Sequence, residues 1–206
     1  MIQLIGPGAA GKSTVGAALA SRLQLSFLDL DMRFRERAGD ISQYLDRHGY
    51  EAYARENVET YRSCLAVADC CGVMALSSGF MTYPERIDPA YHGLRAEIAS
   101  SPSTFVLLPS LDPEVCVAET VRRQVTRPFH RSREREETVI RERYSIYMAL
   151  PASKVETMRP VEEVVEEIAS GLPPNKEWQR TRPAQVMTPR RWTQCSTDAK
   201  GRLDQG

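Results

Sequence analysis

The sequence predicts an α/β protein built on a parallel β-sheet. Short apolar runs alternate along the chain with longer segments of helical periodicity. The first repeat of this pattern starts at the N-terminus: MIQLIG ends at a glycine, KSTVGAALASRLQ has helical spacing, and LSFLDLD ends in two carboxylates. A strand, a glycine loop, a helix and a second strand in this order are typical of the opening of a parallel sheet.

The middle of the chain continues the alternation. Residues 32–69 have a helical pattern with charged faces, and we expect breaks at Gly39 and Gly49. Strand character returns at Val73–Leu76 and again in STFVLLPS, residues 103–110. The second of these runs is apolar throughout, as expected of a strand that is buried on both faces of a parallel sheet.

The last part of the pattern holds two helices and a highly charged segment. Asp112 and Pro113 have the residue types of a helix N-cap and first helical position, and VEEVVEEIAS predicts a helix closed by Gly171. The segment TRPFHRSREREETVIRER, residues 126–143, is either the solvated face of a helix or a mobile lid that brings arginines over a nucleotide. Residues 172–206 are rich in proline and polar residues, which predicts an extended or disordered tail.

The composition is that of an ordinary globular protein of 206 residues, with 42% hydrophobic and 26% charged residues. The 27 basic and 27 acidic side chains balance, so no overall field favours nucleic acid or an anionic membrane. No apolar run reaches the roughly 20 residues of a membrane span, and no secretion signal is recognisable. We therefore expect a cytoplasmic monomer that binds neither nucleic acid nor membrane and acts on a small molecule.

The five cysteines are not arranged as a metal or redox site. No two of them form a Cys-x-x-Cys pair, and their number is odd. We expect Cys64, Cys70 and Cys71 to be reduced, small residues of the core on a helix and at its end.

A phosphate-binding motif stands at the first strand-to-helix junction. Residues Gly6 to Ser13, GPGAAGKS, match the full G-x-x-x-x-G-K-[ST] pattern, after a predicted strand and at the start of a predicted helix. Backbone N–H groups of such a loop turn onto phosphate oxygens, Lys12 reaches the outer phosphates, and the Ser13 hydroxyl ligates Mg²⁺. The sequence therefore predicts a site for a nucleoside triphosphate and Mg²⁺.

Two carboxylates end the second strand of the pattern. Asp29 and Asp31 would face the phosphate loop, because ligands bind at the carboxyl edge of a parallel sheet. Asp29 is then placed to support the Mg²⁺ shell through water, and Asp31, pointing the same way along the strand, to accept a proton from a substrate hydroxyl. The alternative is that one or both carboxylates cap the next helix.

With these motifs the chain resembles the shikimate kinases from about residue 1 to residue 168. The resemblance is carried by IGPGAAGKSTVGAALASRL, FLDLD, RAGDISQYLDRHGYEAYARE, GVMALSSGF, TRPF, RERYSIY and PVEEVVEEI. It implies a three-layer α/β/α P-loop kinase fold over residues 1–171, with five parallel strands and a mobile lid at about 126–142. It also implies phosphoryl transfer from ATP, with Mg²⁺, to a ring hydroxyl of shikimate.

The resemblance also implies roles for individual residues. The catalytic residues would be Lys12, Asp31 and Arg127, the last as a lid arginine that stabilises charge on the transferring phosphoryl group. Arg123 would stack over the adenine, and the rest of the nucleotide would lie on Gly8, Ala9, Ala10, Gly11, Lys12, Ser13 and Thr14. The metal would be held by Ser13 and Asp29. The acceptor would be bound by Asp31, Arg55, Ser78, Gly79 and Arg143, with Arg143 on its carboxylate.

Two departures from the family lie on the acceptor side. The family has three glycines where this chain has Ser77-Ser78-Gly79, so two side chains would narrow or re-aim the pocket. The family's second carboxylate-binding arginine aligns with Ala54, and Arg55 stands one residue late, so that it serves only if the helix is rotated or shifted. A same-fold kinase for another sugar, sugar acid or specialised metabolite is therefore the alternative, and a regulatory ATPase a more distant one.

Overall fold

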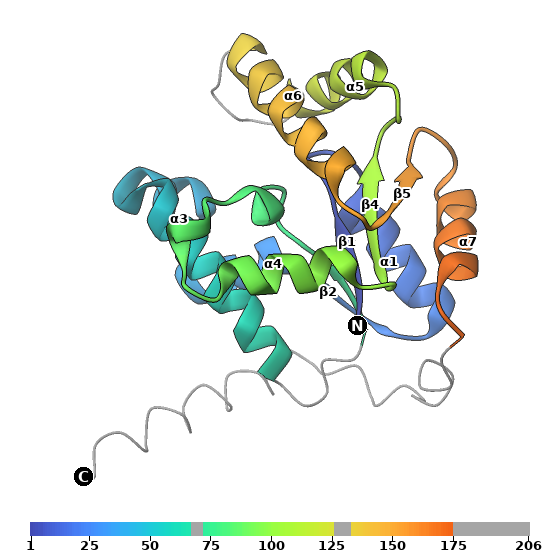
Figure 1. Ribbon diagram of the computed structural model, residues 1–206, viewed down its shortest axis with the longest axis horizontal. Coiled ribbons are helices and arrows are strands. Elements are labelled where there is room, and N and C mark those ends of the chain that lie inside the picture. Colours follow the sequence, from blue (N-terminus) through green and yellow to red (C-terminus); the bar gives the residue numbers. More distant parts are fainter. Residues whose placement is uncertain (67–71, 126–132, 175–206) are drawn as a thin grey trace. The chain divides into compact units, whose positions relative to one another are not determined.

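A computed structural model of the chain describes residues 1–66, 72–125 and 133–174, and its first compact unit comprises Met1–Pro174 (Figure 1). Five parallel strands form one sheet in the order β2-β3-β1-β4-β5. The strands are β1 (Ile2–Ile5), β2 (Ser26–Asp29), β3 (Gly72–Ala75), β4 (Thr104–Leu108) and β5 (Ser153–Glu156). This confirms the α/β class and the five-stranded parallel sheet.

Helices cover both faces of this sheet, which confirms the three layers. The α-helices are α1 (Lys12–Leu23), α2 (Leu30–Ala38), α3 (Ile41–Ala66), α4 (Tyr91–Ser100), α5 (Pro113–Val125), α6 (Arg133–Ala149) and α7 (Val161–Gly171). Helices α1 and α7 pack together on one face, whereas α3 and α4 cover the other (Figure 1). The breaks expected at Gly39 and Gly49 are present, because both glycines have positive φ angles of 88° and 78°.

The core has two parts, one on each face of the sheet, because successive residues of a strand point to opposite faces. On the side of α2, α3, α4 and α6, strand residues such as Met74, Val106 and Leu108 join a cluster that is rich in aromatic rings. The opposite face carries the alternate residues. There Phe105 lies against α7, so closely that a methyl group on Gly171 would come within 3.3 Å of its ring.

The second strand is shorter than the sequence pattern predicted. β2 ends at Asp29, and helix α2 begins at Leu30, so Asp31 lies in the first turn of a helix and not on the strand. The cause is local: the Asp29 carboxylate accepts hydrogen bonds from the backbone N–H groups of Asp31 and Met32, as a helix N-cap does. The prediction that Asp31 lies on the strand and points the same way as Asp29 is therefore wrong.

Several elements had no prediction in the sequence. Between β3 and β4 lie two 3₁₀ turns, η1 (Phe80–Thr82) and η2 (Glu85–Ile87), followed by α4. Strand β5 follows α6 and was missed because only Val155 of its four residues is buried. A single buried apolar residue gives no readable strand pattern.

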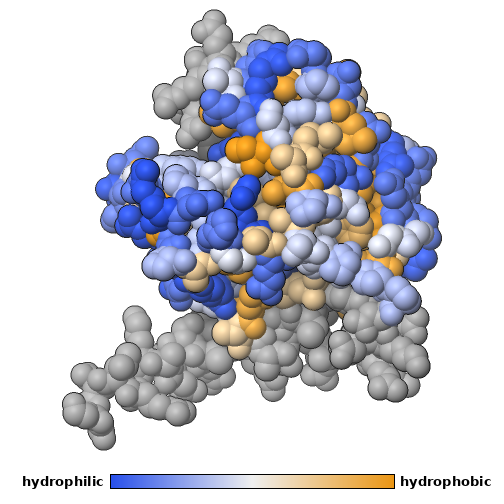
Figure 2. All heavy atoms as spheres, in the orientation of Figure 1, coloured by the Kyte–Doolittle hydropathy of each residue, from blue (hydrophilic) through white to orange (hydrophobic). Residues whose placement is uncertain are grey.

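The surface that Figure 2 shows is mostly hydrophilic, with hydrophobic residues gathered near the middle of the view. Within the described part of the chain, no helix has the length and apolar character that crossing a membrane requires. Cys64 and Cys116 are buried in the core. Cys70, Cys71 and Cys195 lie outside the described residues.

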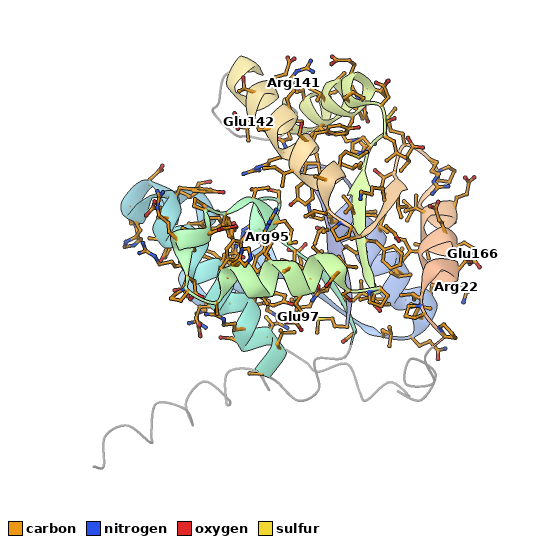
Figure 3. The ribbon with its side chains drawn as sticks, in the orientation of Figure 1. Arg22, Arg95, Glu97, Arg141, Glu142 and Glu166 are labelled. Carbon is orange, nitrogen blue, oxygen red and sulfur yellow. The ribbon has the colours of Figure 1, made fainter. Side chains whose placement is uncertain are left out.

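The charged segment is helical where the structure describes it. Its residues from 133 onward form the start of α6, which carries Arg141 (Figure 3). Arg141 pairs with Glu114 of α5 and with Glu137. Asp112 caps α5 as expected, because its carboxylate accepts a hydrogen bond from the N–H of Val115 at 2.9 Å. Residues 126–132 of the expected lid and the tail from residue 175 lie outside the described residues.

Candidate active site

The phosphate loop joins β1 to α1 and has a backbone that the sequence motif requires. Gly6 has a φ of 144°, and a methyl group there would lie 2.2 Å from the carbonyl oxygen of Leu107, so only glycine fits. Gly11 and Ala9 also have positive φ angles, of 90° and 59°. Alternating conformations of this kind turn successive N–H groups into one concavity, where an anion binds.

Lys12 and Ser13 begin helix α1 directly after this loop. The Lys12 ammonium donates hydrogen bonds to the carbonyl oxygens of Gly6 and Pro7, both at 2.8 Å. The ammonium therefore lies against the loop itself, at the positive end of the helix dipole. The charge of the ammonium group and the positive end of the helix dipole both favour a bound phosphate.

The Ser13 hydroxyl and the Asp29 carboxylate form the pair expected for a metal site. Ser13 Oγ donates to Asp29 Oδ2 at 2.5 Å, while the other carboxylate oxygen caps α2. Asp29 thus caps α2, which is one of the two alternatives that the sequence left, and its other oxygen lies beside Ser13. Among the residues that the structure describes, no three His, Cys, Asp or Glu side chains form a metal cage. The two oxygen donors of Ser13 and Asp29 fit Mg²⁺, which usually takes one or two protein oxygens and completes its shell with phosphate and water.

Asp31 is held by Ser77, which is in turn held by a side chain of α3. Its Oδ1 accepts a 2.5 Å hydrogen bond from the hydroxyl of Ser77, which follows β3. The amide of Asn57, on α3, donates to Ser77 at 2.9 Å and to the hydroxyl of Tyr53 at 3.0 Å. Burial, with a contribution from the Asp31 charge, raises the pKa of Tyr53 to about 12, so its phenol stays neutral.

Ser77 does not narrow the pocket as the sequence suggested. Only 2% of Ser77 is exposed, because its hydroxyl is taken up by Asp31 and Asn57. Ser78 is the partly exposed one of the two serines. Its Cβ lies 3.9 Å from the position where Gly8 of the phosphate loop would carry a Cβ, so it borders the loop directly.

Helix α6 contributes Arg143 to the same region. The Arg143 guanidinium lies 3.4 Å from Ser78 Oγ, and the hydroxyl of Tyr147, one turn later, donates to the Ser78 carbonyl at 3.0 Å. Residues four apart share one face of a helix, which explains the spacing of RERYSIY. The structure therefore brings together Asp31, Ser78, Gly79 and Arg143 at the carboxyl edge of β3.

Arg55 is not brought to this group. Its side chain is 59% exposed and pairs with Glu51 at 3.5 Å, whereas the preceding Ala54 is fully buried. Tyr53, Ala54 and Asn57 form the inward face of α3, and Arg55 projects from the other side. The rotation that Arg55 would need is absent.

The nucleotide side of the loop is bordered by α5 and by the chain after β5. Arg123 donates to the carbonyl of Ala9 at 3.1 Å, and a methyl group on Gly8 would lie 2.3 Å from the amide nitrogen of Gln124. The Thr157 hydroxyl donates to the carbonyl of Ala10 at 3.0 Å. Arg127 lies outside the described residues.

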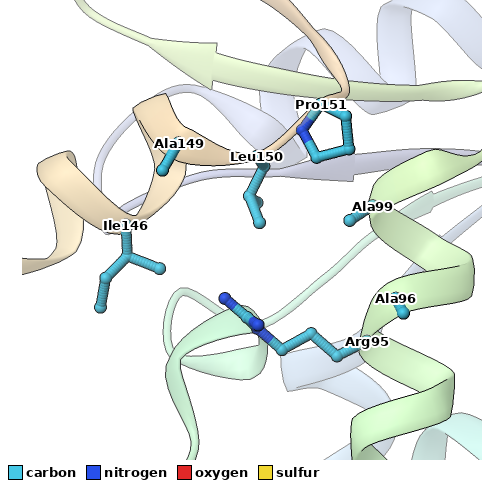
Figure 4. Close-up of a pocket in the computed structure, with 7 residues that line it drawn as sticks. All are labelled: Arg95, Ala96, Ala99, Ile146, Ala149, Leu150 and Pro151. Carbon is cyan, nitrogen blue, oxygen red and sulfur yellow. The ribbon is translucent and has the colours of Figure 1, made fainter.

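A hollow of about 450 Å³ lies elsewhere, between α4 and the end of α6 (Figure 4). Its lining is apolar apart from Arg95, which donates to the carbonyl of Met81. None of the candidate site residues lines it. It offers no carboxylate for proton transfer, so we assign the chemistry to the phosphate loop and its neighbours.

Sequence reasoning missed several residues of the site. Asn57 and Thr157 belong to no motif, and they reach the site through contacts with residues distant in the chain. Asn57 carried one usable signal, since it lies seven residues after Tyr50 and four after Tyr53, on a single helix face.

The chain is similar to one family of known proteins. Residues 8–173 match the model of the family described as shikimate kinase. The shikimate kinase of Thermobifida fusca is 33% identical over 174 residues, which are 82% of this chain and 93% of that protein. The shikimate kinase of Mycobacterium tuberculosis is 31% identical over 163 residues, covering 76% and 83%.

Solved structures share the fold. A shikimate kinase from Acinetobacter baumannii, in complex with shikimate, superposes with a TM-score of 0.63 at 21% identity, over 82% of this chain and 89% of that one. The shikimate kinase of Aquifex aeolicus gives a TM-score of 0.60 at 24% identity, over 82% and 94%.

Proposed function

This chain belongs to the shikimate kinase family, and on that premise we propose that it transfers the terminal phosphoryl group of ATP to a hydroxyl of shikimate, forming shikimate 3-phosphate. The observation that carries the proposal is the position of Asp31. Its carboxylate is fixed by Ser77, in the segment whose next residue, Ser78, borders the phosphate loop. The position of this carboxylate near the phosphate loop supports the proposal, because phosphoryl transfer to an alcohol requires a proton acceptor there.

The phosphate loop binds the donor in this proposal. Its N–H groups and the Lys12 ammonium neutralise phosphate charge, and Ser13 with Asp29 would hold Mg²⁺. Bound there, the metal supplies positive charge to the phosphate oxygens. Arg123 lies against Ala9, in a suitable place to contact the nucleotide base. Arg127 keeps its expected role as a stabiliser of the transferring group.

Asp31 orients the acceptor hydroxyl and accepts its proton as the oxygen attacks phosphorus in line with the leaving ADP oxygen. Arg143 binds the acceptor carboxylate, for which a guanidinium offers paired donors. Ser78 and Gly79 form the floor between these two groups. Most of the rate enhancement then comes from positioning and from charge neutralisation.

A kinase for a different hydroxylated acid is the second candidate, and Arg55 is the observation that favours it. Because Arg55 faces solvent, the second arginine that the family resemblance implies is missing from the acceptor region. The two candidates share the donor chemistry and differ only in the acceptor.

The direct test is ADP release from ATP and Mg²⁺ across a panel of hydroxylated acids and sugars. We expect shikimate to stimulate release far above background hydrolysis. Lys12→Ala should abolish turnover, and Asp31→Asn should abolish transfer while largely sparing ATP binding. Stimulation by another compound alone would replace shikimate as the acceptor, and full activity of Asp31→Asn would remove Asp31 as the base.

Three expectations about the whole chain stay predictions: a monomeric state, a cytoplasmic location and an extended tail at 172–206. Size-exclusion chromatography with light scattering checks the first, and limited proteolysis with mass spectrometry checks the last.

A further inference from the structure

Arg143 is the carboxylate-binding arginine that lies in the acceptor region, and the displaced Arg55 supplies no second donor there. One guanidinium can bind both oxygens of a carboxylate, yet a second donor fixes its direction. The neighbours of Arg143 therefore decide how the acceptor is oriented.

Tyr50 is the neighbour with the right chemistry. A methyl group built on Gly79 would lie 3.0 Å from the hydroxyl of Tyr50 and 3.3 Å from Nη2 of Arg143. A phenol donor and a guanidinium donor thus border the same small region, over the face of Gly79. The ring of Tyr83 is the third neighbour of this point, at 3.2 Å, so a side chain at position 79 would crowd both donors.

The local sequence explains why Tyr50 stands there. It follows Gly49, whose φ of 78° and ψ of 171° interrupt α3 and redirect the chain. Its ring packs against Tyr53 and Tyr83, with ring centroids 6.1 and 5.9 Å apart. The ring is thus oriented by aromatic contacts, while 41% of the residue remains exposed and accessible to a ligand.

The carboxylate that follows Tyr50 in the chain is engaged elsewhere. Glu51 pairs with Arg86 at 2.6 Å, and that hydrogen bond lowers the pKa of Glu51. Its charge is therefore directed to Arg86 and Arg55 and does not compete with an acidic ligand for the Tyr50 hydroxyl.

We propose that Tyr50 is a specificity-determining residue: its hydroxyl, together with the Arg143 guanidinium, binds the carboxylate of the acceptor in the place of the displaced arginine. The proposal rests on the proposed function, since it concerns the acceptor of the same reaction. It restricts that acceptor to a hydroxy acid whose carboxylate lies over Gly79 when its hydroxyl reaches Asp31.

The test compares the wild type with Tyr50→Phe, which removes one oxygen and keeps the ring. With shikimate as acceptor, we expect the KM for shikimate to rise roughly ten- to a hundredfold, as for loss of one hydrogen bond to a charged group. The value of kcat and the KM for ATP should stay within about twofold. Tyr44→Phe is the matched control, because Tyr44 packs on Phe34 and His48, away from Gly79.

A second acceptor separates a lost hydrogen bond from a general disturbance. For the alcohol in which a hydroxymethyl group replaces the carboxylate, the wild-type KM should already be high, and Tyr50→Phe should change it little. An equal rise for acid and alcohol, or no rise for the acid, overturns the proposal.

Failure of the proposed function can be distinguished from failure of the proposal for Tyr50. If shikimate is inert and another hydroxy acid stimulates ADP release, the proposed acceptor is wrong, and Tyr50 is judged on that acid by the same comparison. If only acceptors without a carboxylate are used, or none is, the proposal for Tyr50 is overturned as well.

Discussion

Replacing Ser77 with alanine tests whether Asp31 depends on its buried partner. The Ser77 hydroxyl donates to Asp31 at 2.5 Å and accepts from Asn57 at 2.9 Å, and only 2% of the residue is exposed. Alanine removes both interactions at once. Asp31 is partly exposed and can recruit water, whereas Asn57 is fully buried and, within the described part of the chain, keeps Tyr53 as the partner for its amide hydrogens.

The two losses have different magnitudes and different readouts. A buried donor that loses one of two acceptors should lower the free energy of unfolding by about 1–2 kcal/mol. Loss of a hydrogen bond to a charged carboxylate is worth about 1.5–3 kcal/mol where it orients the reacting group. That range corresponds to a fall in kcat/KM for the acceptor of roughly ten- to a hundredfold, with the KM for ATP unchanged.

The assay pairs ADP release at varied acceptor with urea denaturation of the same preparation. Ser100→Ala is the matched control, since Ser100 is an exposed residue of α4 whose hydroxyl donates only to carbonyl oxygens of its own helix. If Ser77→Ala keeps wild-type kcat/KM for an acceptor that Asp31→Asn cannot use, then Ser77 does not position Asp31 and the reasoning fails.

Two further predictions concern the fold that supports the site. Gly6→Ala should destabilise the chain by about 2–4 kcal/mol, because the φ angle of Gly6 is unfavourable for alanine and the added methyl group would meet the Leu107 carbonyl. Gly93→Ala, in an open position of α4, should stabilise the chain by about 0.5–1 kcal/mol. Urea denaturation of the two variants and the wild type measures both effects. Burial raises the pKa values of Tyr53 and Tyr91 to about 12, against about 10 in the unfolded chain, so the stability they contribute is complete below pH 10 and is lost as the pH rises toward 12. Absorbance titration of the phenols and unfolding at pH 9 to 11 check this, and a free energy of unfolding that rises over that interval would contradict it.

The phosphate loop was predictable because its function is a property of local backbone. Gly6 and Gly11 need positive φ angles, and the spacing of Lys12 and Ser13 follows from the start of a helix, so a single stretch of sequence specifies the geometry. The breaks at Gly39 and Gly49 were readable for the same reason. A backbone position in the left-handed region favours glycine, so the residue type itself indicates the conformation.

The acceptor side was less predictable because it depends on contacts between distant segments. The hydrogen bond from Ser77 to Asp31 joins residues 46 positions apart, and no periodicity indicates it. The pattern also placed Asp31 on a strand, because the sequence left capping as an alternative and did not show that the cap at Asp29 ends β2 there. Motifs identify residue types, whereas the direction of a side chain depends on tertiary packing.

This division has a consequence for specificity. Glycine geometry restricts the donor side, so the loop tolerates little change. The acceptor side is assembled from single side chains of α2, α3, α6 and the turn after β3, each of which can be replaced while the sheet stays intact. Ser77, Tyr50 and the outward Arg55 all lie on that side. Ser78 contacts both the donor side and the acceptor side, because it borders Gly8 and lies 3.4 Å from Arg143. The identity of the acceptor can therefore diverge in this fold while phosphoryl transfer itself is retained.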